Sequence, residues 1–293
     1  MEDKIISYGG QAVIEGVMMR GRNAFAVAMR APDGNILVHK EGLGAVYRSR
    51  IAKLPFLRGT ILLWDALGLG MKALTLSANT QTGEDEKLEG PALYLTLGTS
   101  LAIGIGLFVL LPAGIGGLAE HYLGWQALAH NLLEGLVRLI LLVGYMWGIG
   151  FMPDVKRLFG YHGAEHKTIN AFEAGAELTP DVVAEYPIEH PRCGTAFMLT
   201  FVLVSVLVYS VLGDLGIFWR LVSRILLIPV IAGIAVEYIR WTANHLDSPL
   251  VRLLIKPNLA LQSLTTRNPD SSMLEVAIES FKTMRQAEQE FVV

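Results

Sequence analysis

Two histidines stand four residues apart in the chain, His162 and His166, with Glu165 directly before the second. The order His-x-x-Glu-His is typical of one class of zinc enzymes. On an α-helix, side chains four residues apart lie on one face, so both imidazoles can reach a single ion. Glu165 can then reach a metal-bound water as a general base without being a ligand. The pattern therefore predicts a divalent metal site, with zinc as the best candidate.

Two further ligand-type residues, His190 and Cys193, end the same polar loop. Imidazole and thiolate both suit a borderline-soft metal. Four protein ligands would close a structural site, whereas three ligands and a water would leave a catalytic one. The alternatives are a solvated histidine pair and a cysteine that is merely a small buried side chain. The loop holds the only cysteine of the chain and several of its seven histidines, and this concentration favours a metal.

Two acids outside this motif are candidate partners of the histidines. Glu173 shares the face of the histidines, but seven residues beyond His166 is about 10 Å of helix rise, too far for the same metal shell. It is predicted to be a surface or second-site acid. Glu15 lies in an apolar run and is either a second catalytic acid or the partner of Arg20 or another base.

A second group of ionisable residues, His130, Glu134 and Arg138, recurs every four positions in an apolar stretch. Ionisable residues in such a setting often mark a polar path. The alternative is a Glu134–Arg138 pair that only neutralises itself.

Composition limits the kind of protein that must position these residues. Of 293 residues, 52% are hydrophobic and 17% are charged, against roughly 25% charged residues in a soluble domain. The net charge of −3 excludes the strongly basic balance of a nucleic-acid binder. One cysteine excludes an intrachain disulfide framework. The first ten residues lack the pattern of a cleavable signal peptide.

Four apolar stretches, at 93–118, 132–151, 195–212 and 221–238, approach or reach the roughly 20 residues that span a bilayer. Residues 56–77 are apolar too, but three charges interrupt them. A charge near a bilayer centre costs at least ~2.5 kcal/mol, so this segment is predicted to be interfacial or buried in the bundle. The predicted fold is mainly α: a polytopic helical membrane protein with about four transmembrane helices, a small N-terminal β-rich cytosolic region and cytosolic amphipathic helices.

The predicted organisation has six segments along the chain. Strands at 24–30 and 35–39 are joined by a Pro-Asp-Gly turn, a polar acidic linker follows at 80–90, and a capping box at Ser272 opens the last helix. The segments are a cytosolic β-rich region, 1–50; an interfacial or bundle-buried helix and acidic linker, 51–90; transmembrane helices one and two, 91–151; the cytosolic loop with the metal site, 152–194; transmembrane helices three and four, 195–242; and an interfacial segment with a C-terminal cytosolic helix, 243–293.

Lysine and arginine are absent from 120–131 and frequent in 152–194 and in both terminal flanks. In membrane proteins, loops rich in lysine and arginine remain on the cytosolic side. We therefore expect a multi-pass protein of the bacterial inner membrane with the 152–194 loop and both termini in the cytosol.

Several motifs together resemble the YqhQ-like family of bacterial membrane proteins, and the resemblance covers nearly the whole chain. The matching segments are GQAVIEGVMMR at 10–20, LPFLRG at 54–59, YHGAEHKTI at 161–169, HPRCGT at 190–195 and LTTRNPD at 264–270. The resemblance implies a membrane protein of a family described as predicted metal-dependent enzymes, with no established reaction.

These observations predict a membrane-embedded metal-dependent enzyme, a hydrolase acting at the cytosolic membrane surface. Its ligands would be His162, His166 and one or both of His190 and Cys193; its base would be Glu165, with Glu15 as second acid. The substrate would be a lipid headgroup or membrane-bound peptide, and Arg192 or Lys167 could meet an anionic group. The alternatives are a small oligomeric transporter or channel and an assembly protein with a structural metal.

The orientation can be tested with single cysteines placed at Gln126 and Glu177 in a Cys193→Ala background. An impermeant thiol reagent added to intact cells should label position 126 and spare position 177, because only the first lies outside. The reverse labelling would overturn the orientation.

Overall fold

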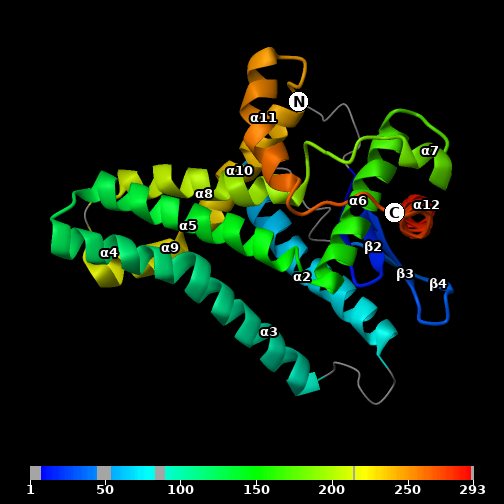
Figure 1. The fold of residues 1–293 in the computed structure, drawn as a ribbon, viewed down its shortest axis with the longest axis horizontal. Helices are drawn as coiled ribbons and strands as arrows, with labels where there is room; N and C mark the ends of the chain where they lie inside the picture. Colours follow the sequence, from blue (N-terminus) through cyan, green and yellow to red (C-terminus); the bar gives the residue numbers. More distant parts are fainter. Residues whose placement is uncertain (1–7, 45–53, 83–89, 214, 292–293) are drawn as a thin grey trace.

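A computed structural model describes residues 8–44, 54–82, 90–213 and 215–291 (Figure 1). Residues 83–89, within the linker predicted at 80–90, lie outside the described residues, as do residues 1–7. The described part is mainly helical, with a four-stranded sheet at its N-terminal end.

The sheet is an antiparallel meander in the order β1-β2-β3-β4. The predicted strand at 24–30 is confirmed, and its partner starts one residue later than expected. Gly34 has a φ of 88°, a conformation that suits glycine, and so lets the chain turn between them. The first hairpin was not predicted. The strands are β1 Gly9–Val13, β2 Gly16–Arg20, β3 Ala24–Arg30 and β4 Ile36–Gly42.

Helices cover both faces of the sheet, so β2 and β3 are almost completely buried. Helices α6 (Pro153–Glu173) and α12 (Ser271–Glu290) pack on one face, while the later part of α2 (Leu57–Gln81) packs on the other. The N-cap of the last helix is Asp270, two residues before the predicted Ser272, and its carboxylate accepts from the Met273 N–H at 2.9 Å.

Helix α2 joins the sheet to the apolar helices. Near its start, Arg58 forms an ion pair with Glu237 of α10 (Ile228–Ala243). Near its end, the Ser77 hydroxyl accepts from the Ile14 N–H at 3.2 Å. A single helix therefore connects the sheet to the bundle. Its first half packs on α10, in agreement with the prediction of a segment that is interfacial or buried in the bundle.

Among the described residues, three helical stretches are long and apolar enough to cross a membrane: Gly90–Leu123, Leu128–Ile149 and Gly194–Val211. A fourth candidate consists of α9 (Ile217–Leu226) and α10, which meet at a bend of 47°. The apolar stretch predicted over 221–238 lies within this bent pair of helices. The break falls at Leu227, just before Pro229, which lacks the N–H that a continuing helix needs.

The stretch from Gly90 to Leu123 is not a single regular helix. Helix α3 (Gly90–Ile105) leads through a π-helical turn, η3 (Gly106–Leu110), into α4 (Leu111–Leu123). The remaining helices are α5 Ala127–Ile149, α7 Pro180–Ala184, α8 Gly194–Val211, α9 Ile217–Leu226 and α11 Pro249–Gln262.

A buried ion network links the apolar helices. Glu134 of α5 accepts from Arg138 at 2.7 Å, which confirms the predicted pair, and from Arg224 of α9 at 2.6 Å. Arg138 also donates to the Phe108 carbonyl in the π-helical turn at 2.9 Å. The ring of Tyr209 lies 4.1 Å from the Arg224 guanidinium. One carboxylate thus serves two buried cations on different helices.

This sharing predicts an asymmetric response to substitution. Glu134→Gln leaves two buried cations without an acid and should cost about 3–5 kcal/mol of stability. Arg138→Met leaves the Glu134–Arg224 pair intact and should cost clearly less. Thermal unfolding of the detergent-solubilised protein measures both. The double variant Glu134→Gln, Arg138→Met should not recover wild-type stability, because Arg224 still lacks its acid; full recovery would contradict the network.

Candidate metal centre

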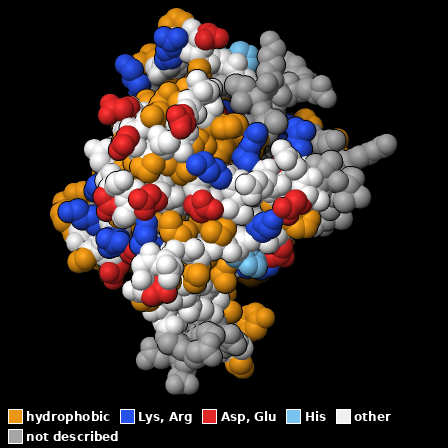
Figure 2. All heavy atoms as spheres, turned by 90° about the vertical axis from the view of Figure 1, so that its right-hand side faces the viewer, with side chains coloured by type: hydrophobic (Ala, Val, Ile, Leu, Met, Phe, Trp, Pro, Cys, Tyr) orange, Lys and Arg blue, Asp and Glu red, His pale blue; other side chains and the backbone are white. Residues whose placement is uncertain are grey.

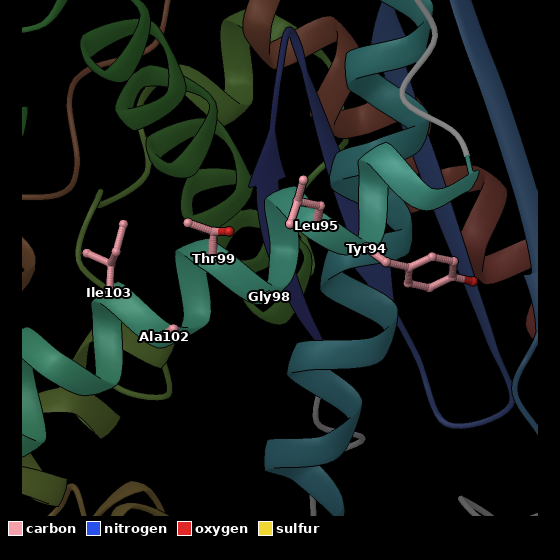
Figure 3. A pocket seen from close by; sticks show the side chains of 6 residues that line it. All are labelled: Tyr94, Leu95, Gly98, Thr99, Ala102 and Ile103. Carbon is pink, nitrogen blue, oxygen red and sulfur yellow. The ribbon is translucent and has the colours of Figure 1, made fainter.

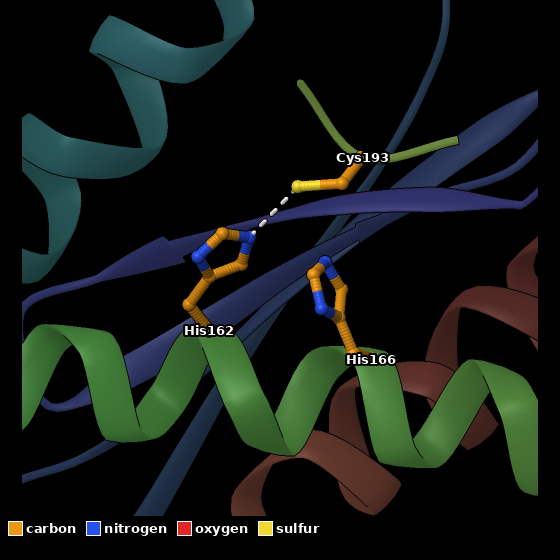
Figure 4. A group of neighbouring side chains, drawn as sticks. All are labelled: His162, His166 and Cys193. Atoms are coloured by element: carbon orange, nitrogen blue, oxygen red, sulfur yellow. Dashed lines mark hydrogen bonds between the residues drawn. The ribbon is translucent and has the colours of Figure 1, made fainter. Parts of the chain in front are cut away.

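Three of the four predicted ligands come together at one point. His162, His166 and Cys193 each present a ligand atom, and all three atoms lie within 4.8 Å of one another. The two imidazoles project from one face of α6 toward the thiol (Figure 4). The Nε2 atom of His162 lies 3.2 Å from the Cys193 sulfur. These separations are those expected of ligands to one ion, since zinc bonds run about 2.0–2.3 Å.

The thiol owes its position to the start of α8. Cys193 is the N-cap residue, and its sulfur accepts from the Thr195 N–H at 3.4 Å. A helix N-terminus carries a partial positive charge and favours the thiolate.

Both histidines are anchored through the ring nitrogen that faces away from the thiol. His162 donates from Nδ1 to the Thr265 carbonyl at 2.8 Å, and His166 donates from Nδ1 to the Ile188 carbonyl at 2.7 Å. A carbonyl only accepts, so each Nδ1 atom carries a proton and each Nε2 atom faces the cluster, where its lone pair could bind a metal ion once the nitrogen is deprotonated. Metal-binding histidines typically have this arrangement. The buried Nε2 atom of His166 has no hydrogen-bond partner among the described residues.

The Cys193 thiol and the His162 imidazole favour each other's charged forms. Burial alone would raise the pKa of Cys193, but the facing imidazoles outweigh it and hold that pKa well below its usual range. Burial alone would lower the pKa of His162, but the hydrogen bond and charge of Cys193 raise it to about 9. The lowered pKa of Cys193 favours the thiolate, which is the form that binds metals.

Glu165 lies beside the cluster and away from solvent, with 5% of its surface exposed. The backbone N–H of Gly10 donates to its carboxylate, and its Oε2 atom has no partner in the described part of the chain. Burial raises the pKa of this carboxyl above its usual value. A side chain at position 10 would meet the Met18 carbonyl oxygen at 2.6 Å and Glu165 Cδ at 2.9 Å, so the sheet can approach the acid only through a glycine.

The other predicted residues of the loop lie just outside this group. The ring of His190 is centred 5.7 Å from that of His166, and its Nε2 atom lies 3.9 Å from the Glu173 carboxylate. Glu173 also forms an ion pair with Arg192. Glu173 therefore stands outside the three-residue cluster, as predicted, where it orients His190.

Side chains of α6 hold this loop against the helix. Lys167 donates to the carbonyls of Ala184 and Tyr186 at 2.8 and 2.6 Å. Asn170 donates to the carbonyls of Pro187 and Glu189. The Lys167 ammonium, expected to meet an anionic group, is thus engaged by backbone, and Arg192 is engaged by Glu173.

Glu15 lies in the β1–β2 turn, away from the cluster. Its carboxylate accepts from Arg157 at 2.5 Å and from the Tyr161 hydroxyl at 3.2 Å. The expected pairing with a base is present, with Arg157 of α6 as the base. Its φ of 51° is unusual outside glycine, and the ion pair on α6 holds the turn in that conformation.

The sequence did not indicate Gly10, Thr265, Gln262 or Asn170 as parts of the centre. Gly10 contributes by lacking a side chain, and Thr265 contributes its backbone carbonyl. Gln262 and Asn170 hydrogen-bond to the loop backbone through their side-chain amides. None of these contributions produces a characteristic spacing in the sequence. Two hollows lie elsewhere, on the apolar helices. One, of about 540 Å³, lies along a single face of α3 between Tyr94 and Ile103 (Figure 3). The other lies between α4 and α9 beside Arg220.

Comparisons with known proteins agree with the motifs. The family model described as "Protein of unknown function (DUF1385)" matches residues 54–287. The "Uncharacterized protein YqhQ" of Bacillus subtilis (strain 168) is 36% identical over 299 aligned residues, covering 96% of this chain and 93% of that protein. No solved structure matches the chain. The protein therefore belongs to the DUF1385 family, together with the YqhQ-like proteins whose motifs it shares.

Proposed function

We propose that this protein is a metal-dependent hydrolase embedded in the bacterial inner membrane, with a zinc centre at the cytosolic surface. The observation that carries the proposal is the convergence of His162, His166 and Cys193 with both Nδ1 atoms anchored on carbonyls. That arrangement turns both Nε2 atoms and the thiol sulfur toward one point, and two imidazoles with a thiolate are a donor set that zinc prefers.

Several features support insertion in a membrane. Exposed aromatic side chains gather at both ends of the apolar helices, as in proteins with aromatic belts. At one end they are Tyr122, Trp125, Phe218 and Trp219, and at the other Trp147, Phe151 and Trp241. Ionisable side chains of both signs cover the end of the molecule that holds the sheet (Figure 2). The apolar middle between these levels matches a bilayer core.

The residues present fit a catalytic zinc ion better than a structural one. His190, the candidate fourth ligand, has its Nε2 atom near Glu173, so three ligands remain. Zinc held by three protein ligands keeps a position at which water is activated for hydrolysis. Glu165 is buried beside these ligands, and burial raises its pKa above the usual value, which suits a group that accepts and returns a proton.

The transporter alternative has weaker support. The acid that would line its path, Glu134, is fully engaged by two arginines. An apolar layer that includes Leu142, Met146 and Leu199 lies on the sheet side of that network. We therefore favour a hydrolase over a transporter. Its substrate would be a membrane lipid headgroup or a membrane-bound peptide.

Metal analysis of the purified protein tests the centre. The wild type should bind about one zinc ion per chain. His162→Ala, His166→Ala and Cys193→Ala should each lose most of the metal, because each removes one of three ligands. His190→Ala should retain zinc, as should the control His245→Ala, which alters an exposed histidine outside the cluster. Loss of zinc from His190→Ala would indicate a closed, structural site.

The catalytic role of Glu165 needs a separate test. Glu165→Gln should keep the zinc content and lower the rate of zinc-dependent hydrolysis by about 10²–10⁴-fold, the usual contribution of a general base. A panel of phospholipids and peptide esters in micelles would supply the substrate. Glu177→Gln, an exposed substitution in the same loop, should have no effect. Full activity in Glu165→Gln would remove this residue from the mechanism.

A further inference from the structure

We infer that α11 (Pro249–Gln262) rests on the headgroups of acidic phospholipids and that this contact holds the metal centre together. The lipid contact is a property of the α11 surface alone, whereas its effect on the centre rests on the proposed metal site. Both follow from where α11 lies and from what its last turn contacts.

The two faces of α11 differ in the way expected of an interfacial helix. Its inner face, which includes Val251, Ile255 and Leu261, is buried against the bundle. On its outer face, Leu250, Leu253 and Leu254 are 62%, 59% and 41% exposed. Water-facing helices usually carry polar residues at such positions, whereas helices that lie in a membrane interface carry apolar ones.

The charge and direction of α11 select the partner. Arg252 and Lys256 are exposed beside the leucines, and the helix contains no acidic residue. Basic residues next to exposed leucines favour anionic lipid. In Figure 1, α11 crosses the direction of α5 and α8 at the end of the bundle nearest the sheet. If those helices span the membrane, α11 lies along its cytosolic surface, so an acidic leaflet fits it better than a protein partner.

The last turn of α11 and the residues after it contact both sides of the metal centre. Gln262 clamps His190: its Oε1 atom accepts from the His190 N–H at 2.9 Å, and its Nε2 atom donates to the His190 carbonyl at 3.0 Å. Thr265 supplies the carbonyl that orients His162. Cys193 follows His190 by three residues. A shift of α11 therefore displaces the cysteine loop and the anchor of one histidine together.

The single cysteine gives a direct measurement that needs no activity. The full-length protein would be placed in nanodiscs of phosphatidylcholine alone or with phosphatidylglycerol. In the metal-free protein, alkylation of Cys193 by N-ethylmaleimide should be several-fold slower with the acidic lipid, because the buried thiol opens less often. Zinc affinity, measured by chelator competition, should be several-fold higher in the same discs.

Two double variants separate the lipid contact from general charge effects. Arg252→Gln with Lys256→Gln should behave like the wild type in phosphatidylcholine and lose the response to phosphatidylglycerol. Arg22→Gln with Lys282→Gln removes the same charge from exposed positions near the sheet and should keep the response. Gln262→Ala should lose the response while α11 keeps its basic residues.

The outcomes distinguish the two halves of the inference. Equal alkylation rates in the two lipids would overturn it, whether or not zinc binds, and so would loss of the response in the Arg22 and Lys282 control. A lipid-dependent alkylation rate without zinc binding in either disc would support the α11 contact and overturn the proposed metal centre.

Discussion

The hydrogen bond from His166 Nδ1 to the Ile188 carbonyl, at 2.7 Å, is the contact on which the candidate centre depends. It fixes the tautomer of His166, and it also holds the chain between α6 and α8 folded back along α6. Lys167 and Asn170 strengthen the same fold through four more carbonyls. The loop is held at several points. Placing Cys193 at the start of α8 beside the histidines therefore costs little additional conformational entropy.

Close backbone approach is the second requirement of this arrangement. A side chain at Gly163 would lie 2.1 Å from the Arg267 carbonyl oxygen, so only glycine lets the chain after α11 lie against α6 there. That approach brings the Thr265 carbonyl to His162. Gly10 does the same on the sheet side, next to Glu165. The two glycines allow two segments distant in sequence to reach the same helix that bears the motif.

The apolar helices have a polar centre of their own. Glu134, Arg138 and Arg224 join α5 to α9 and lie on the far side of an apolar layer from the histidine cluster. A carboxylate that serves two cations restricts how the helices can pack, because each alternative arrangement would leave a buried charge unpaired. The network thus specifies the arrangement of the bundle whose end supports α11 and α6.

The sequence alone determined the features that local periodicity encodes. The spacing of His162 and His166, the apolar helices and the hairpin of β3 and β4 follow from residues within a few positions of one another. It could not place Arg157 beside Glu15, choose Cys193 over His190, or reveal the carbonyl of Thr265, which lies 103 residues from His162. Such contacts depend on how α6, the sheet and α11 pack. Backbone carbonyls, and glycines that permit close approach, produce no recognisable spacing of residue types in the sequence. The residue types predicted a metal centre, and the packing of distant segments decided which three of the predicted ligands lie together.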